Sequence, residues 1–316
     1  VLPGSWPWDV DLGEGQQRTL RCLPALLQQQ GYQSEFVQGS SKRYTGLDDM
    51  LTGAGFDEVY GRDDLDAIYA EAPRNPWGLH DREVFDFTVR RIEALRSQKK
   101  AYFVAALGID SHLPGNARPG CKAPSPIDQH RALRSIYCAD AELGRLFAAF
   151  DRLGLWEDTV IVITADHAMQ NTRNVQQWTG DDRAGSFAAI PLLLHVPGMT
   201  LPTRLQGTSG QIDLAPTLAD LAGLSGQHSA MAGHNLLTER ARHPLLLGRM
   251  GRRAVGVRFG DHGRSYPTGE LARRCHDGLP LLDEVEAVLG ACDAARYLHW
   301  IDALWFSDRM TPATDR

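Results

Sequence analysis

The feature that most constrains the fold is an apolar, β-branched run from Thr159 to Thr164, which ends abruptly at Asp166 and His167. Such a run is typical of a strand buried on both faces, as in a parallel sheet covered by helices. Open α/β sheets bind their ligands at the carboxyl ends of such strands. Because carboxylate and imidazole groups bind divalent ions, Asp166 and His167 indicate a metal site. The alternative is a strand that closes with a turn aspartate and a partly exposed histidine.

Strands and helices alternate along most of the chain. Apolar residues at helical spacing predict helices over 18–30, 47–54, 81–98 and 129–153, and one that begins near Asp213. Strands are expected at 33–38, 102–107, 159–165 and 190–196. This order predicts an α/β fold with a mostly parallel central sheet flanked by helices. We expect a main domain over 1–240 and a smaller α+β subregion over 241–316, with strands at 245–247 and 254–259.

Size and charge narrow the class of protein. With 316 residues, of which 43% are hydrophobic, the chain can bury a full core. The formal net charge of −6 gives no electrostatic reason to expect nucleic acid as a partner. The sequence has no apolar run of about 18 residues, no signal-like start and no initiator Met. We therefore expect the chain to be part of a longer protein.

The five cysteines show neither a Cys-x-x-Cys pair nor zinc-finger spacing. Cys121 and Cys138 flank one polar segment, and Cys275 and Cys292 bracket another. Loops of this size are readily closed by disulfides, which would indicate an oxidising compartment. The alternative is that all five, including Cys22, are reduced structural thiols.

Several segments between residues 20 and 237 together form a recognisable pattern. They are Leu23-Pro-Ala-Leu-Leu-Gln-Gln-Gln-Gly-Tyr32, Phe36-Val-Gln-Gly39, Gly55-Phe-Asp-Glu-Val-Tyr-Gly61, Asn75-Pro-Trp-Gly78, Asp110-Ser-His112-Leu-Pro114, Leu155 to His167, and Gly210-Gln-Ile-Asp213-Leu-Ala-Pro216-Thr217. This pattern resembles the alkaline phosphatase and sulfatase superfamily, in the branch of lipoteichoic acid synthases and phosphoglycerol transferases. The segment from Gln38 to Leu65, with Trp77 downstream, is closer to the phosphoglycerol transferases of the osmoregulated periplasmic glucan pathway. Cys121 and Cys138 also fall where that resemblance places a pair.

The resemblance implies roles for three residues. It makes Asp166 and His167 two ligands of a divalent metal, Mn or Zn with Mg also possible. It makes His112 a catalytic residue that contacts the phosphate and can donate a hydrogen bond to one of its oxygens. In this family a metal-bound threonine attacks phosphorus and forms a phospho-threonine intermediate. That threonine and an acidic metal ligand precede the position matched by Val1, so we expect both to lie outside this chain and the chain alone to be inactive.

The substrate contacts of the family are matched only in part. Thr45 and Leu47 stand where the Gram-positive synthase has Trp and Arg. Lys42 and Arg43 nearby, and Arg173 on the loop after the metal-binding pair, are candidates to bind the anionic substrate. The alternative for all three is a solvated surface charge.

The function that the resemblance implies is transfer of glycerol phosphate from phosphatidylglycerol to a periplasmic glucan or similar hydroxyl acceptor. The protein would then act at the periplasmic face of a Gram-negative inner membrane, anchored by a segment outside this chain. A sulfatase or phosphodiesterase of the same superfamily is one alternative. Sulfatases normally need Cys-x-Pro-x-Arg, however, and Cys22-Leu-Pro24-Ala-Leu26 lacks the arginine. The other alternative is a non-catalytic binding module that keeps the fold without the nucleophile.

Overall fold

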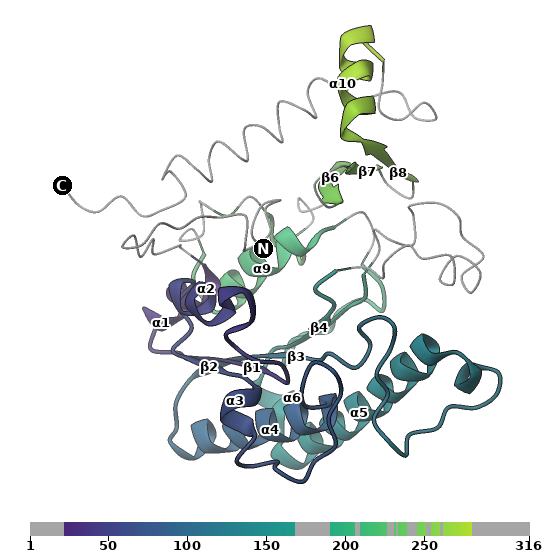
Figure 1. Cartoon of the computed structure of the whole chain (residues 1–316). Helices are drawn as coiled ribbons and strands as arrows, with labels where there is room; N and C mark the ends of the chain where they lie inside the picture. Colours follow the sequence, from purple (N-terminus) through teal and green to yellow (C-terminus); the bar gives the residue numbers. More distant parts are fainter. Residues whose placement is uncertain are drawn as a thin grey trace. The chain divides into compact units, whose positions relative to one another are not determined.

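Figure 1 shows the computed structural model, which describes residues 22–167, 190–205, 209–225, 231, 233–238, 245–250, 254–259 and 262–279. The chain divides into two compact units, Pro7–Thr159 and Val160–Arg316, the latter together with Val1–Trp6. This division does not test the expected boundary near residue 240, which stays a prediction.

A parallel sheet lies at the centre of the first unit. Its middle strand, β1 (Gln33–Gln38), pairs in parallel with β2 (Glu58–Tyr60) on one side and with β3 (Tyr102–Leu107) on the other. Buried residues occupy both faces of β1, as expected for a parallel strand with helices on either side. Figure 1 shows α1 (Leu23–Gln28) and α2 (Leu47–Gly53) on one face of this sheet.

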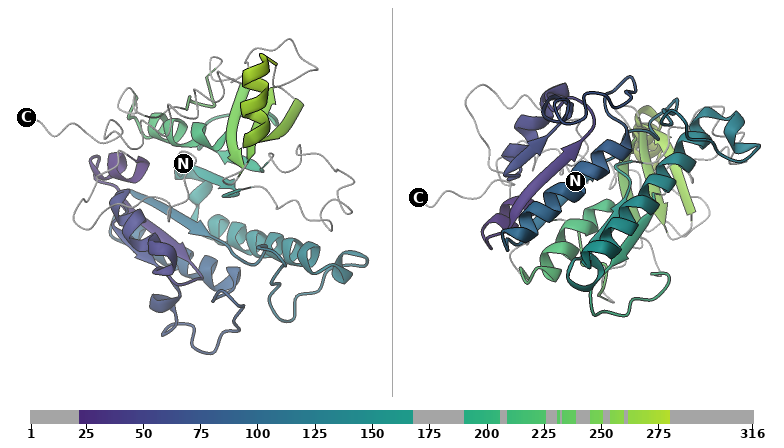
Figure 2. Two further views of the ribbon diagram at one scale, coloured as in Figure 1. Left: turned by 45° about the horizontal axis from the view of Figure 1, so that its top comes forward. Right: turned by 90° about the horizontal axis from the view of Figure 1, so that it is seen from below.

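The opposite face is covered by longer helices. α4 (Asp81–Ser97) contacts β1 and β3 through its apolar stripe, and α5 (Arg131–Leu153) lies beside α4 (Figure 2). α5 ends at Gly154, whose φ of 68° is the left-handed conformation that glycine adopts freely at a helix end. Two short helices complete the unit, α3 (Arg62–Leu65) and α6 (Leu155–Asp158). The buried core under β1 consists of Val37, Leu65, Leu79, Val84 and Phe87.

A buried ion pair fixes α4 on the sheet. Glu35 of β1 is fully buried, and both of its oxygens accept hydrogen bonds from Arg91 of α4, at 2.7 and 2.8 Å. The guanidinium also lies 5.2 Å from the centre of the Tyr60 ring. Burial, followed by the Glu35 charge, raises the pKa of Tyr60 to about 12. The buried carboxylate is therefore compensated by one bidentate partner.

The second unit begins with β4 (Ile161–Thr164), the strand that ends before Asp166. β4 pairs antiparallel with β5 (Leu192–His195), with Ile161 opposite His195 and Thr164 opposite Leu192. This differs from the expected strand at 159–165, which was predicted to be buried on both faces and to have parallel neighbours. The side chains of β4 are half-buried or exposed. A run of β-branched residues favours an extended backbone but does not fix the direction of its partner.

Further along, a 3₁₀ turn (Gln211–Asp213) leads into α9 (Leu214–Leu221). A three-stranded antiparallel sheet follows, and α10 (Thr268–Asp277) comes after it. The strands of that sheet are β6 (Leu245–Met250), β7 (Ala254–Phe259) and β8 (His262–Pro267). The predicted α/β fold with a smaller C-terminal α+β part is confirmed, although β8 and α10 were not predicted.

The cysteines agree with the oxidised alternative where they are described. Cys121 and Cys138 form a disulfide, and Cys275 is also disulfide-bonded. Cys292 lies outside the described residues. Cys22 is a half-buried free thiol whose pKa is raised by burial. No helix in the described part of the chain is long and apolar enough to cross a membrane.

Candidate functional site

The carboxyl end of β1 is closely covered by the loop that precedes α4. The backbone N–H of Leu79 donates to the carbonyl of Gly39 at 2.9 Å. Gly78 has a φ of 150°, and a Cβ there would collide with that same carbonyl. A Cβ on Gly39 would in turn come within 2.5 Å of the Leu79 carbonyl. The two glycines thus let two backbones meet at the sheet edge where α/β proteins bind ligands.

Two buried aspartates hold this loop and the loop after β3 together. Oδ1 of Asp81, the first residue of α4, accepts the backbone N–H groups of Ile109 and Asp110 at 2.6 and 3.1 Å. Oδ2 of Asp110 accepts the backbone N–H of Asp81 at 3.2 Å. Both aspartates are 2% exposed. We call this reciprocal arrangement the aspartate clasp; it anchors the segment that carries His112.

Asp110 also binds two side chains of the covering loop. Its Oδ1 lies 2.8 Å from Nδ1 of His80 and 2.9 Å from the donating Nδ2 of Asn75. Sequence spacing gives no signal for the contact of His80 with Asp110, because the two residues lie 30 positions apart. Nε2 of His80 is buried and has no hydrogen-bond partner among the described residues.

The clasp is electrostatically costly. Burial, and then the nearby Asp110, raise the pKa of Asp81 from 3.8 to about 6, although hydrogen bonds from Ile109 and Asp110 oppose the rise. When two buried carboxylates are neighbours, the ionisation of one makes the ionisation of the other less favourable. Asp81 therefore titrates near neutral pH while holding the loop of His112.

His112 lies at the outer end of that loop. Its Nδ1 is 2.9 Å from the carbonyl of Leu113, and its ring meets Trp77 edge to face with centroids 4.8 Å apart. The backbone N–H of Trp77 donates to Oδ1 of Asn75 at 2.8 Å, so the same asparagine binds both Trp77 and Asp110. His112 is half-buried, and the imidazole is held on two sides. Such a fixed imidazole suits the predicted contact with a phosphoryl oxygen.

The cations predicted at the substrate site differ in their surroundings. Nζ of Lys42 lies 2.8 Å from Oδ1 of Asp64, so its charge is already compensated. Arg43 is exposed in the turn before residue 44. Arg173 lies outside the described residues. The structure adds Arg62, whose side chain packs against Gly78 and whose nearest carboxylate is 4.0 Å away.

In the second unit, Asp166 and His167 follow β4 directly and are both exposed. Oδ1 of Asp166 accepts the backbone N–H of His167 at 2.9 Å, and Oδ2 lies 3.5 Å from Nε2 of His167. Nε2 of Gln211 donates to the carbonyls of Ala165 and Asp166 at 2.6 and 2.7 Å. Gln211 thus fixes the backbone on which both candidate ligands stand.

The 3₁₀ turn that supplies Gln211 is itself anchored. The carboxylate of Asp213, which is fully buried, accepts the backbone N–H groups of Gly210 and His234 at 2.9 Å each. The hydroxyl of Thr217 donates to the Asp213 carbonyl at 2.6 Å and accepts the N–H of Leu236 at 2.8 Å. Through these bonds, Gly210-Gln-Ile-Asp213 forms a rigid support for the end of β4.

The geometry of Asp166 and His167 fits a metal ion. Two ligands of one tetrahedral zinc, each bound at about 2.1 Å, stand roughly 3.4 Å apart, close to the observed 3.5 Å. One carboxylate oxygen of Asp166 accepts a backbone hydrogen bond, and the other oxygen faces the His167 ring. Within the described residues no group of three or more His, Cys, Asp or Glu side chains gathers around one point. The pair can therefore supply two ligands of a site.

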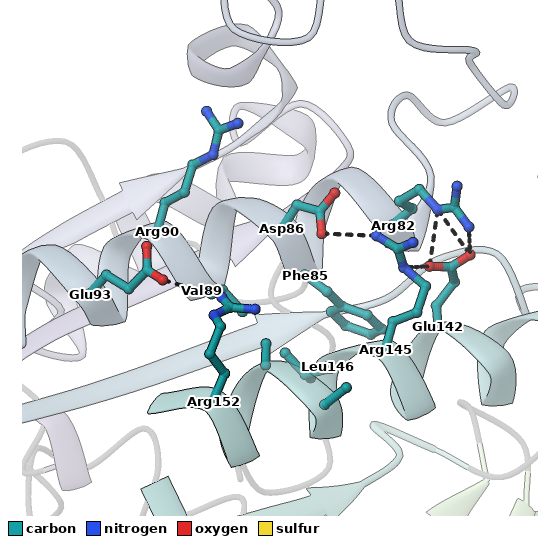
Figure 3. Close-up of a pocket in the computed structure, with 12 residues that line it drawn as sticks. Arg82, Phe85, Asp86, Val89, Arg90, Glu93, Glu142, Arg145, Leu146 and Arg152 are labelled. Atoms are coloured by element: carbon teal, nitrogen blue, oxygen red, sulfur yellow. Dashed lines mark hydrogen bonds and ion pairs between the residues drawn. The ribbon is translucent and has the colours of Figure 1, made fainter. Parts of the chain in front are cut away.

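A groove of about 460 Å³ between α4 and α5 (Figure 3) does not add a charged site. Arg82 binds Glu142 through three hydrogen bonds, and Arg145 contacts that glutamate and Asp86. Three of the four arginines that line the groove are paired with carboxylates, the third being Arg152. The groove thus offers little uncompensated charge to an ionic ligand.

Known proteins resemble this chain in sequence and in fold. Phosphoglycerol transferase I of Salmonella arizonae is 31% identical over 157 residues, which cover 48% of this chain and 21% of that protein. A protein in the alkaline phosphatase superfamily from Vibrio parahaemolyticus has a TM-score of 0.73 at 18% identity, over 99% of this chain and 74% of that chain. Lipoteichoic acid synthase LtaP from Listeria monocytogenes has a TM-score of 0.69 at 19% identity, over 95% and 75%. At such identities the two solved structures show the fold alone.

The family model named Sulfatase matches residues 4–224. The chain spans about a fifth of the length of its Salmonella relative, so the activity of that whole protein is not carried over by the match. The family match covers more than half of the chain and includes β1, the loop of His112, and the pair at the end of β4. The chain therefore belongs to the sulfatase family of the alkaline phosphatase superfamily.

Proposed function

We propose that this chain is part of a metal-dependent phosphoglycerol transferase that moves glycerol phosphate from phosphatidylglycerol to a periplasmic glucan or similar hydroxyl acceptor. The observation that carries the proposal is the spacing of Asp166 and His167 at the end of β4, which suits one divalent ion. The 31% identity to a phosphoglycerol transferase I favours this substrate over others handled by the superfamily.

Each residue of the chain has a definite task in this proposal. Asp166 and His167 would hold the divalent ion, which lowers the pKa of a bound hydroxyl and neutralises charge on the phosphoryl oxygens. Gln211 keeps the backbone of both ligands in place. His112 would donate a hydrogen bond to a phosphoryl oxygen, and the aspartate clasp keeps its loop from shifting. Arg43 and Arg173 remain proposed contacts for the anionic substrate.

The proposed metal is Mn or Zn, with Mg also possible. Members of the superfamily generally use divalent metals. An aspartate and a histidine form a mixed oxygen and nitrogen donor set, which Zn and Mn accept readily, whereas Mg prefers oxygen donors. The proposed location is the periplasmic face of a Gram-negative inner membrane. The disulfides at Cys121 and Cys275 support an oxidising compartment.

A sulfatase is the less favoured alternative. Cys22 begins a segment that resembles the start of the sulfatase modification motif, but Leu26 stands where that motif has arginine. Cys22 is moreover a half-buried thiol at the start of α1, with a raised pKa. A non-catalytic binding module stays the alternative from a different class.

One experiment separates these functions. The natural full-length protein is incubated with phosphatidylglycerol and a glucan oligosaccharide, and in parallel with an aryl sulfate. The proposal predicts glycerol phosphate on the glucan and no sulfate release. Sulfate release without transfer would favour the sulfatase, and turnover of neither substrate would favour the binding module. His112→Ala is the matched variant, expected to lower kcat by about 10²-fold or more because it removes one donor to the transition state.

A further inference from the structure

We propose that Arg131 is a positioning residue that holds the loop of His112 in place from the side of α5. The inference rests on the proposed function, because it names a residue that acts through His112. Arg131 is the first residue of α5, and its Nε donates to the carbonyl of Gly115 at 2.6 Å. Its Nη2 donates to Oδ1 of Asn116 at 3.0 Å. One guanidinium thus binds two successive residues of the segment that follows His112.

Hydrogen bonds within the loop pass this restraint on to His112. The backbone N–H of Gly115 donates to the carbonyl of His112 itself at 2.8 Å. The backbone N–H of Asn116 donates to the carbonyl of Asp110 at 2.8 Å. Nδ2 of Asn116, which is buried, also donates to the His112 carbonyl, at 3.4 Å. The two residues that Arg131 binds are therefore the ones that bind back to His112 and to the start of its loop.

The end of the loop lies directly on the first turn of α5. Gly115 has a φ of 95°, in the left-handed region that glycine adopts freely. A Cβ at Gly115 would come within 2.6 Å of the Arg131 carbonyl and 2.7 Å of Oγ of Ser135. Ser135 is fully buried, so this surface of the helix is fixed. The backbone of α5 and the side chain of Arg131 therefore contact the same glycine.

His112 is held between two anchors. The aspartate clasp fixes the start of its loop on α4 through Asp110, and Arg131 fixes the end of the loop on α5. Arginine suits this task because its planar guanidinium presents several donors in a fixed geometry, whereas lysine presents one compact charge. Since a displacement of about 1 Å at a catalytic group can cost about 10²-fold in rate, loss of the second anchor should slow the reaction.

The test measures transfer of glycerol phosphate by the natural full-length protein and by Arg131→Ala, Arg131→Lys and Arg152→Ala. Arg152 is the matched control, since it is another exposed arginine of α5 but binds Glu93 rather than the loop. We expect Arg131→Ala to lower kcat about tenfold, with KM for phosphatidylglycerol changed less than about twofold. Arg131→Lys should recover part of kcat, because lysine can still bind one of the two acceptors, and Arg152→Ala should behave as wild type. Because Arg131 is exposed, its replacement should leave the protein folded, which the thermal midpoint verifies.

A double variant shows whether Arg131 acts through His112. In a His112→Ala protein, adding Arg131→Ala should change kcat less than about twofold, because no imidazole is left to position. Equal losses of kcat in both backgrounds would overturn the inference, as would an unchanged kcat in Arg131→Ala. A His112→Ala protein with the kcat of wild type would refute the proposed role of His112, and the inference with it.

Hydrogen exchange tests the restraint without any turnover. The backbone N–H groups of His112, Gly115 and Asn116 should exchange faster in Arg131→Ala than in wild type and in Arg152→Ala. If exchange is faster in Arg131→Ala but the wild type transfers no glycerol phosphate, the proposed function fails while the restraint on the loop stands. If exchange is the same in wild type and Arg131→Ala, the inference is wrong even where transfer is observed.

Discussion

Replacing Asp81 with Asn should abolish a large pH dependence of stability. Asp81 is 2% exposed, and burial beside Asp110 raises its pKa from 3.8 to about 6. A carboxyl with a raised pKa stabilises the folded state when protonated, so its contribution is complete below pH 4 and is lost as pH rises through 6. A shift of about two units corresponds to about 3 kcal/mol of unfolding free energy. Asn keeps a carbonyl oxygen for Ile109 and Asp110 but cannot ionise.

The assay is urea denaturation at several pH values between 4 and 7 for wild type, Asp81→Asn and Asp81→Ala. The difference between wild type and Asp81→Asn reports the titration of Asp81 within the Asp81–Asp110 pair, and it should shift by about 2–3 kcal/mol in favour of the variant as pH rises over that range. The unfolding free energy of Asp81→Ala should depend on pH in the same way as that of Asp81→Asn. It should be lower than that of Asp81→Asn by about 1–3 kcal/mol, because two backbone N–H groups lose their acceptor. If the difference in unfolding free energy between wild type and Asp81→Asn is the same from pH 4 to pH 7, Asp81 does not have a raised pKa in the folded protein.

Three further perturbations follow from the contacts described. Gln211→Ala should weaken divalent metal binding by about 10- to 100-fold in a chelator competition, because the ligand backbone loses two hydrogen bonds; unchanged affinity would contradict the supporting role. Arg91→Met should lower the unfolding free energy by about 3–5 kcal/mol, since Glu35 would stay buried and unpaired. The double variant Arg91→Met with Glu35→Met should recover much of this loss. If the double variant does not recover it, the unpaired Glu35 is not the cause of the loss. Replacing Cys121 and Cys138 by Ser should cost about 3 kcal/mol in urea denaturation, as expected for a cross-link spanning 17 positions, and a change under 1 kcal/mol would contradict that value.

Much of the fold could be predicted because it depends on local patterns. The apolar stripe of α4 and the strand at 102–107 were found within one or two residues of their observed ends. The pairing of β4 could not be found in this way, since β-branched composition is the same for parallel and antiparallel neighbours. β8 was missed because His262–Pro267 is largely polar and gives little alternation of apolar and polar residues.

The residues of the candidate site divide in the same way, into those that a local sequence pattern indicates and those that only long-range contacts reveal. Asp166, His167 and His112 could be proposed from the sequence because each ends or follows a strand within a recognisable segment. The aspartate clasp was missed, since Asp81 and Asp110 are 29 residues apart and meet only when α4 packs against β3. The role of Gln211 was missed for the same reason, as its side chain reaches a backbone 45 residues away. Long-range hydrogen bonds between loops leave no periodic signal in the sequence.

The central claim is that Asp166 and His167 hold a divalent metal used for phosphoglycerol transfer. The most direct test is metal content by mass spectrometry, measured together with glycerol phosphate transfer, on the natural full-length protein and on Asp166→Ala and His167→Ala. We predict bound Mn or Zn in the wild type, and loss of metal and transfer together in both variants. Full transfer by a wild-type protein stripped of metal, or variants that keep both metal and transfer, would contradict the claim.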